Sequence, residues 1–311
     1  MSSTSSILIV GTGALACLFA ARFSAVGIPV TMLGTWQEGI DVLRSQGVCL
    51  IDGEGSKHHY KVRVVTDPEE CLDVESALAL VKSWQTERAA GQLRSCLSAQ
   101  GQVLTLQNGL GNREKLAHVL GIDRVFQGIT TLGGTLLGPG LVRAGGDGLI
   151  SIEAHPKLAR LSEIFQQAHF AVQKTVEIEP LIWGKLAVNA AINPLTAILD
   201  VPNGDLLKSR SSKKLMGLAA IEVEKVAKAT GIHLPFDDVV EAVEEVVQRT
   251  ARNYSSMLQD MRRGAPTEIE AINAAVLRTA DRVGKSAPVN QTLYLIVKSM
   301  LDPHSKMSVS R

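Results

Sequence analysis

Three polar side chains, Lys185, Asn189 and Asn193, lie four residues apart in an otherwise apolar segment. Four-residue steps on an α-helix place side chains along nearly one stripe, and polar groups on a buried helix cost free energy unless polar partners meet them. Pro194 is expected to bend or end this helix, because proline lacks an N–H and disfavours helical dihedrals at the preceding residue. The pattern predicts the wall of a site. The alternative is that Lys185 reaches water and the two amides bond to nearby backbone.

The segments that must position such a stripe differ between the two halves of the chain. In the first half short apolar runs alternate with helical ones, which predicts a doubly wound, largely parallel sheet. A turn-rich stretch between two of the strands favours a hairpin. The expected strands are 7–10, 30–33, 48–51, 60–65, 77–81, 103–106, 125–129 and 149–152, the hairpin joins 48–51 to 60–65, and the expected helices are 14–26, 36–46, 86–97 and 113–120.

A glycine-rich loop, Gly11-Thr-Gly-Ala-Leu-Ala16, follows the first expected strand and opens the first expected helix. In that context the spacing predicts dinucleotide binding. Gly11 permits the tight turn, Gly13 lets the backbone approach a pyrophosphate, and Ala16 is small enough for helix–strand packing. The helix N-terminus offers unpaired N–H groups to the anion. The expected binding residues are Gly11, Thr12, Gly13, Ala14, Leu15 and Ala16; a strand-to-helix turn without a ligand is the alternative.

From about residue 181 the periodicity becomes helical, in segments 211–230, 237–261, 267–283 and 289–301. We therefore expect an α/β fold followed by an all-α one. A Rossmann-type dinucleotide-binding domain is expected over residues 1–178, and a helical substrate and catalytic domain over residues 179–311. The helical domain is also a candidate for homodimer formation.

Further polar groups follow expected strands, at the carboxyl ends where open α/β sheets bind ligands. Lys82 follows one strand, and Gln107 and Asn108 follow the next. An ordinary solvent-facing charge and an ordinary turn are the alternatives. After the second strand, Thr35 occupies the place where an acid would hold a ribose 2′-hydroxyl, and no acid occurs before Glu38. NADP is therefore permitted and NAD is not specifically anchored, although no arginine is present to hold a 2′-phosphate.

The composition argues against several classes of partner. With 32 basic and 31 acidic residues the net charge is +1, so no overall field favours nucleic acid or a membrane surface. The four cysteines are widely spaced, without a metal-binding pattern, which predicts a reduced cytoplasmic protein. No uninterrupted apolar run reaches the roughly 18 residues of a transmembrane helix. The adjacent His58 and His59 lack companions for a metal, and a polar strand edge or loop is the preferred interpretation.

Together these segments resemble the ketopantoate reductase (2-dehydropantoate 2-reductase) family over nearly the whole chain. Besides the glycine loop, the resemblance is carried by Val81-Lys-Ser-Trp-Gln-Thr86, Leu106-Gln-Asn-Gly-Leu-Gly111, Lys185-Leu-Ala-Val-Asn-Ala-Ala-Ile-Asn-Pro-Leu-Thr-Ala197, Asn253-Tyr-Ser-Ser-Met-Leu-Gln-Asp260 and Thr267-Glu-Ile-Glu-Ala-Ile-Asn273. The resemblance implies NADPH-dependent reduction of a small 2-keto acid, 2-dehydropantoate, to pantoate in pantothenate and coenzyme A biosynthesis. An arginine common in the family after the second strand is replaced near Thr35, which weakens the expectation of a strong NADP preference.

The resemblance also implies roles for individual residues. Lys185 matches the general acid, and Glu268 matches a glutamate that engages the substrate. Lys82 and Asn108 match residues near the nicotinamide end. Gln107, directly before Asn108, is expected to bind the cofactor with them. The residues that match the substrate pocket are Asn189, Asn193, Asn253 and Ser256, and Asn108 is expected to contribute to it as well.

The chemistry of these side chains agrees with those roles. Hydride delivery to a ketone builds negative charge on oxygen, so a positioned proton donor is needed, and Lys185 can supply both charge and proton. Burial would lower the pKa of this lysine, and an anionic partner such as Glu268 would counter that effect. Thr267 and Glu270 form a capping-box pattern, which places Glu268 in the first turn of a helix, where the dipole favours its ionised form.

Several alternatives compete with this interpretation. Tyr294 and Lys298 have the Tyr-x-x-x-Lys spacing of short-chain dehydrogenases, but they lie far along the chain from the glycine loop, and helix packing with a solvated lysine is preferred. A β-hydroxyacid dehydrogenase also places a lysine and an asparagine on one helix, yet the residues before Lys185 lack its glycine-rich run. A related 2-keto acid reductase of the same family, or a non-catalytic NADP(H)-binding sensor, also stays open.

Overall fold

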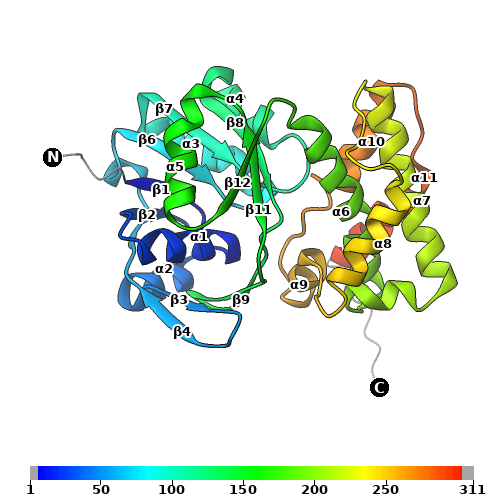
Figure 1. Ribbon diagram of the computed structural model, residues 1–311, viewed down its shortest axis with the longest axis horizontal. Coiled ribbons are helices and arrows are strands. Elements are labelled where there is room, and N and C mark those ends of the chain that lie inside the picture. Colours follow the sequence, from blue (N-terminus) through cyan, green and yellow to red (C-terminus); the bar gives the residue numbers. More distant parts are fainter. Residues whose placement is uncertain (1–5, 303–311) are drawn as a thin grey trace. The chain divides into compact units, whose positions relative to one another are not determined.

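The computed structural model describes residues 6–302, which divide into two compact units (Figure 1). Unit 1 extends to Gln107 and resumes over Asn112–Ile178. Unit 2 comprises the described residues from Glu179 to 302 together with the short segment Asn108–Gly111. Unit 1 is α/β and unit 2 is helical, which confirms the expected fold class. The excursion of residues 108–111 into the helical unit was not foreseen.

An eight-stranded sheet forms the centre of unit 1, in the order β12-β11-β8-β7-β6-β1-β2-β5. Neighbouring strands are parallel except for β8 and β11, which are antiparallel. The chain passes from β1 outward to β2 and then returns to β6 on the other side of β1, which creates a topological switch point at β1. The strands are β1 Ile7–Val10, β2 Val30–Leu33, β5 Arg63–Val65, β6 Val74–Ala79, β7 Leu97–Thr105, β8 Val125–Thr130, β11 Leu149–Glu153 and β12 Ala171–Thr175.

Five α-helices accompany this sheet, and an aromatic cluster anchors the first of them. Phe19 and Phe23 of α1 pack with Phe165 and Phe170, with ring centroids between 4.7 and 6.0 Å apart. Buried aromatic pairs contribute beyond their area alone, so this cluster fixes α1 and the loop that enters it. The helices are α1 Ala14–Ala25, α2 Gln37–Gln46, α3 Thr86–Cys96, α4 Asn112–Leu120 and α5 Ala159–Gln167.

A second sheet of four strands, in the order β4-β3-β10-β9, completes unit 1. It corrects the expected hairpin, because β3 pairs with Lys57–Tyr60 and the residues 63–65 pair with β2 in the main sheet instead. The polar sequence of β4 carries no apolar alternation, which explains why it was missed. His58 lies on this edge strand and bonds Asp52 at 2.8 Å, as the strand-edge interpretation anticipated. The strands are β3 Val48–Ile51, β4 Lys57–Tyr60, β9 Gly134–Gly138 and β10 Leu141–Ala144.

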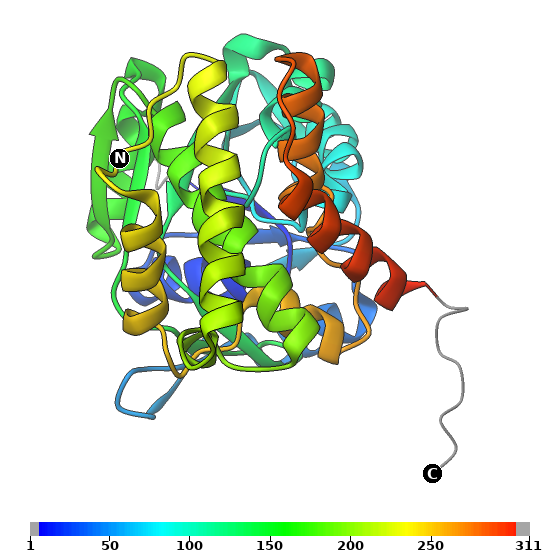
Figure 2. The ribbon, with the colours of Figure 1, turned by 90° about the vertical axis from the view of Figure 1, so that its right-hand side faces the viewer.

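Up to residue 302, unit 2 is formed by six α-helices, and Figure 2 shows how they pack together. The expectation of one helix over residues 237–261 is wrong, because the chain turns between α8 and α9. Backbone N–H groups of Asn203 and Gly204 donate to Asn253 and Ala251 in that turn, and the Ser255 hydroxyl accepts the N–H of Leu258 to begin α9. The helices are α6 Glu179–Leu199, α7 Arg210–Ala229, α8 Val239–Arg249, α9 Ser256–Arg262, α10 Asn273–Arg282 and α11 Pro288–Leu301.

Helix α6 is the core helix of unit 2 and packs against α7, α8, α9 and α11. Among residues 6–302 it is the one helix long and apolar enough to cross a membrane, and 72% of its most apolar window is buried inside the protein. Burial of that kind is what a central helix of a globular unit requires. The helix continues through Pro194 to Leu199, so the alternative that it ends at the proline is wrong.

Candidate active site

The polar stripe lies on α6 as its spacing predicted. Lys185 and Asn189 are partly buried, and Asn193 is 6% exposed. The residues between them, such as Leu186 and Ala190, are buried in the core of unit 2. The three polar groups therefore interrupt an otherwise apolar surface.

Burial and a neighbouring carboxylate set the protonation of Lys185. Removal from water lowers the pKa of its ammonium group from 10.5 to about 8, and the charge of Glu268 opposes that shift. Glu268 is itself 5% exposed, and its Oε2 accepts a hydrogen bond from Asn108 Nδ2 at 3.2 Å. A lysine whose pKa lies near the pH of the surrounding solution can act as a proton donor, because the ideal catalytic pKa lies near the operating pH.

Glu268 lies in a turn before α10, so the predicted capping box is wrong. Helix α10 begins at Asn273, and the N–H groups of Ala271 and Ile272 both donate to the Glu268 carbonyl at 3.0 Å. The buried hydroxyl of Thr267 has no hydrogen-bond partner within residues 6–302. The sequence pattern of a cap was present, but the chain makes a compact turn there instead.

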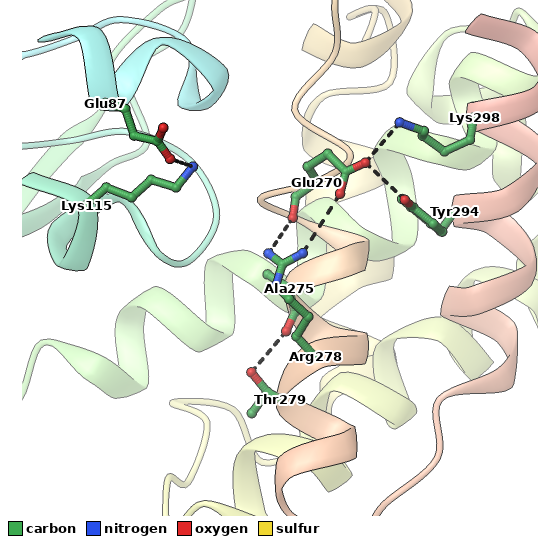
Figure 3. A network of polar contacts seen from close by, with 8 residues as sticks. All are labelled: Glu87, Lys115, Glu270, Ala275, Arg278, Thr279, Tyr294 and Lys298. Atoms are coloured by element: carbon green, nitrogen blue, oxygen red, sulfur yellow. Dashed lines mark hydrogen bonds and ion pairs between the residues drawn. The ribbon is translucent and has the colours of Figure 1, made fainter. Parts of the chain in front are cut away.

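Glu270, the expected second half of that cap, faces α11 (Figure 3). Tyr294 Oη and Lys298 Nζ each donate to Glu270 Oε1 at 3.0 Å, and Arg278 donates to the Glu270 carbonyl at 2.9 Å. Lys298 is thus ion-paired rather than only solvated, which corrects the earlier interpretation. The Tyr294–Lys298 pair ties the turn that carries Glu268 to the last helix.

The segment Asn108–Gly111 docks on the same turn. The N–H of Leu110 donates to the Ala271 carbonyl at 2.9 Å. Gly109 has a φ of +82°, and a Cβ at this position would lie 2.2 Å from the Ala271 oxygen. Only glycine satisfies both conditions, which explains the Asn-Gly pair and places Asn108 beside Glu268.

Asn253 and Ser256 flank the start of α9. Asn253 is exposed in the turn before the helix, and Ser256 is its partly buried first residue. Sequence reasoning missed the neighbouring Ser255, whose hydroxyl is hydrogen-bonded to that of Thr196 on α6 at 2.7 Å. The bond ties the start of α9 to the helix that carries the polar stripe. A Ser-x-x start before a helical run was the signal that could have identified this cap.

In unit 1 the glycine loop has the geometry that an anion requires. Gly11 has a φ of +131°, and a Cβ there would approach the Leu80 carbonyl to 3.0 Å. Gly13 precedes α1 and receives no side-chain cap, and a Cβ at Gly13 would meet nothing within 4 Å. Ala16 is fully buried. The loop therefore leaves N–H groups and open space at the N-terminus of α1, which fits a pyrophosphate.

Other expected cofactor residues follow neighbouring strands of the main sheet. Gln107 Nε2 donates to the Val81 carbonyl at 2.8 Å and to Thr86 Oγ1 at 2.9 Å, so the ends of β6 and β7 are joined. Lys82 is partly buried directly after that carbonyl, and Thr35 is exposed after β2. These groups gather at the carboxyl edge of β1, β2, β6 and β7, on either side of the switch point.

Comparison with known families agrees with this geometry. The family model described as "Ketopantoate reductase PanE/ApbA" matches residues 7–157, and the one described as "Ketopantoate reductase PanE/ApbA C terminal" matches residues 177–301. The chain belongs to the ketopantoate reductase family. This confirms the family that the motifs indicated.

Similar members of the ketopantoate reductase family cover almost the whole chain. A 2-dehydropantoate 2-reductase of Halobacterium salinarum is 34% identical over 298 residues, which are 94% of this chain and 97% of the relative. A 2-dehydropantoate 2-reductase of Listeria innocua is 30% identical over 306 residues, 96% of this chain and 98% of the relative.

Solved structures show the same architecture. The PanE/ApbA family ketopantoate reductase of Ralstonia eutropha has a TM-score of 0.89 and 30% identity, and the match covers 96% of this chain and 98% of that one. A D-mandelate dehydrogenase solved with NADH and anilino(oxo)acetate has a TM-score of 0.90 and 25% identity, with the same coverage.

Proposed function

We propose that this protein is a 2-dehydropantoate 2-reductase, which reduces the keto group of 2-dehydropantoate to the hydroxyl of pantoate with NADPH. The observation that carries the proposal is the Lys185–Glu268 pair of unit 2, a partly buried ammonium whose pKa is lowered to about 8 beside a buried carboxylate. Membership of the family and the 2-dehydropantoate 2-reductase relatives support the assignment.

In the proposed reaction Lys185 protonates the substrate oxygen. Negative charge develops there as the carbonyl is reduced, and a positioned cation stabilises it. Proton donation by such a group typically contributes about 10²–10⁴-fold to the rate. The charge of Glu268 raises the pKa of Lys185 and so increases the fraction of molecules in which this lysine is protonated. The side-chain amide of Asn108 donates a hydrogen bond to the Glu268 carboxylate and holds it in place.

The neutral groups around this pair are proposed to hold the substrate. Amides and a hydroxyl can donate to a carboxylate without adding a second buried charge. Asn189 and Asn193 extend along α6 from Lys185, and Ser256 begins the helix that the Thr196–Ser255 bond ties to α6. The proposed substrate-binding residues are Asn108, Asn189, Asn193, Asn253 and Ser256.

We propose that unit 1 holds the dinucleotide. NADPH, when bound, supplies the hydride. The N–H groups after Gly13 would hold the pyrophosphate, since they are uncapped and face open space. The remaining proposed cofactor residues are Gly11, Thr12, Ala14, Leu15, Ala16, Thr35, Lys82, Gln107 and Asn108.

The general-acid role is tested by replacing Lys185. Lys185→Ala is expected to lower kcat for 2-dehydropantoate by about 10²-fold or more while the Kd for NADPH stays unchanged, since the lysine lies in unit 2 and the glycine loop in unit 1. The matched control is Lys214→Ala, which removes an exposed lysine of α7 and should leave both constants unaltered. An unchanged kcat in Lys185→Ala would reject the assignment.

The cofactor site is tested by adding a methyl group at Gly13. Its Cβ meets nothing within 4 Å, so Gly13→Ala should fold normally but bind NADPH more weakly, because the methyl occupies the space that the phosphate needs. Gly11→Ala is the contrasting variant, since its positive φ and close approach to Leu80 should lower the unfolding midpoint. Undiminished NADPH binding by Gly13→Ala would contradict the site.

A reductase for a different 2-keto acid is the second candidate. The similarity to D-mandelate dehydrogenase, with a TM-score of 0.90, favours it. A panel of aliphatic and aromatic 2-keto acids assayed with NADPH and NADH separates the two, because a 2-dehydropantoate 2-reductase should have its highest kcat/KM for 2-dehydropantoate. Cofactor binding without turnover of any 2-keto acid would instead indicate a sensor.

We also propose a cytoplasmic location and a homodimer. All four cysteines are free and buried, as expected where thiols stay reduced.

Several large apolar side chains of unit 2 are exposed, and such residues can form a subunit interface. They are Leu215 and Leu218 on α7 and Leu295, Ile296 and Met300 on α11. Light scattering of the purified protein would show a monomer if the dimer proposal is wrong.

A further inference from the structure

Pro194 leaves one carbonyl of the catalytic helix without its usual donor. In an α-helix the N–H of residue 194 would bond the carbonyl of residue 190, and proline has no N–H. Helix α6 nevertheless continues through Pro194. The amide of Asn273 fills the gap, since its Nδ2 donates to the Ala190 carbonyl at 3.1 Å.

The Asn273 amide is held in one orientation by a second bond. Its Nδ2 also donates to Asn290 Oδ1 at 3.0 Å. Both side chains are 0% exposed. If the oxygen and nitrogen of the Asn273 amide were exchanged, its oxygen would face two acceptors, the Ala190 carbonyl and Asn290 Oδ1. These two acceptors therefore fix which end of the Asn273 amide is the nitrogen.

Asn290 is in turn fixed by α7. Its Nδ2 donates to the Ala219 carbonyl at 3.0 Å and to Glu222 Oε2 at 2.9 Å. The Glu222 carboxylate also accepts the backbone N–H groups of Val289 and Asn290 at 2.8 and 2.9 Å, and so caps the N-terminus of α11. A continuous network thus runs from the buried amides of α10 and α11 to α6 on one side and to the partly buried Glu222 of α7 on the other.

We propose that Asn273 is a positioning residue for the reduction, which replaces the hydrogen bond that Pro194 cannot give and so fixes α6 relative to the turn that carries Glu268. Ala190 lies directly after Asn189, which is about one turn beyond Lys185. Asn273 lies at the end of the turn that begins at Glu268. One amide therefore links the two segments that bear the proposed acid and its carboxylate.

The inference rests on the proposed function for its kinetic part and on the hydrogen bond alone for its structural part. Misplacement of reacting groups by about 1 Å can cost on the order of 100-fold in rate. Asn273→Ala should therefore lower kcat by about 10- to 100-fold, with the Kd for NADPH unchanged. Thr279→Val on the same helix is the matched control, because its buried hydroxyl bonds only groups of α10, the Ala275 carbonyl and Arg282 (Figure 3 shows the former).

The decisive variant is the double replacement Asn273→Ala with Pro194→Ala. Alanine at 194 restores an N–H that can bond the Ala190 carbonyl within the helix. The double variant should unfold at a higher denaturant concentration than Asn273→Ala does, because the Ala190 carbonyl regains a donor. Its kcat should stay low, because no bond then joins Ala190 of α6 to the turn that carries Glu268. Independent sites would instead give additive effects on the unfolding midpoint, without recovery.

The outcomes separate the parts of the inference. A kcat for Asn273→Ala equal to that of Thr279→Val, or a return of kcat to the parent value in the double variant, would overturn the positioning role. An unfolding midpoint that does not recover in the double variant would overturn the replacement of the missing helical bond. If Asn273→Ala does not fold, Pro194→Ala is compared with the double variant, and equal kcat values in these two would also overturn the positioning role. The unfolding measurements need no substrate, so recovery there with an inactive parent protein would point to failure of the proposed function instead.

Discussion

At the scale of single residues, the chemistry depends on a lysine that the fold keeps partly buried. Burial lowers the pKa of Lys185 to about 8, so below that pH the group carries the proton that the reduction consumes. The kcat/KM for keto acid reduction should be level below pH 8 and fall tenfold per unit above it, since the deprotonated amine cannot donate. A profile that stays level to pH 10 would show that another group is the acid.

Glu268 should control the midpoint of that profile. Its negative charge raises the pKa of Lys185 against the effect of burial. Glu268→Gln keeps the shape and removes the charge, so the pKa of Lys185 should fall further and the loss of kcat/KM should begin at a lower pH than in the parent. Glu270→Gln is the control two residues away, because that carboxylate bonds Tyr294 and Lys298. An upward shift in Glu268→Gln would contradict the electrostatic pairing.

At the scale of elements, a four-residue excursion of the chain helps to hold the site. Gly109 combines a φ of +82° with a Cβ position 2.2 Å from the Ala271 oxygen, whereas Gly111 has a φ of +89° and open space. Both replacements by alanine cost about 1–2 kcal/mol for the left-handed backbone. Gly109→Ala should cost more, and it should also lower kcat because Asn108 leaves Glu268. Chemical denaturation and kinetics of the two variants test this, and equal losses would be inconsistent with docking of the segment.

Sequence patterns predicted the elements whose form is decided by residues that neighbour one another along the chain. Strands 7–10, 30–33 and 48–51 have the expected bounds, because compact apolar runs between turn residues leave little choice. The polar stripe of α6 was predictable for the same reason, since helical spacing alone aligns Lys185 with Asn189.

Elements whose form depends on distant partners could not be predicted. The short strands β9 and β10 lack a strong apolar pattern of their own; β10 pairs with β3, and β9 pairs with β10. The turn at Glu268 has the sequence of a helix start, yet bonds from Leu110 and Lys298 favour another conformation. The donor that meets the Ala190 carbonyl beside Pro194 comes from Asn273, which lies far along the chain.

At the scale of the whole molecule, the two units have separate cores. The buried residues of the apolar clusters of unit 1 lie between residues 7 and 170 and include none of the segment 108–111. The buried residues of the apolar cluster of unit 2 begin at Trp183. Proteins with separate cores commonly depart from two-state unfolding. A cofactor that binds one unit therefore need not protect both to the same degree.

The three tryptophans allow this expectation to be measured. Trp36 and Trp84 lie in unit 1 and Trp183 is buried in unit 2, so Trp183→Phe leaves reporters of unit 1, and Trp36→Phe with Trp84→Phe leaves a reporter of unit 2. At a free NADPH concentration of 100 times each variant's own Kd, binding stabilises the folded form by about 2.7 kcal/mol. The unit 1 signal should move to higher denaturant by more than the Trp183 signal does. Equal shifts would mean that the segment 108–111 couples the units into one cooperative structure, because its anchors at Glu268 and Ala271 would then unfold together with the strand that precedes it.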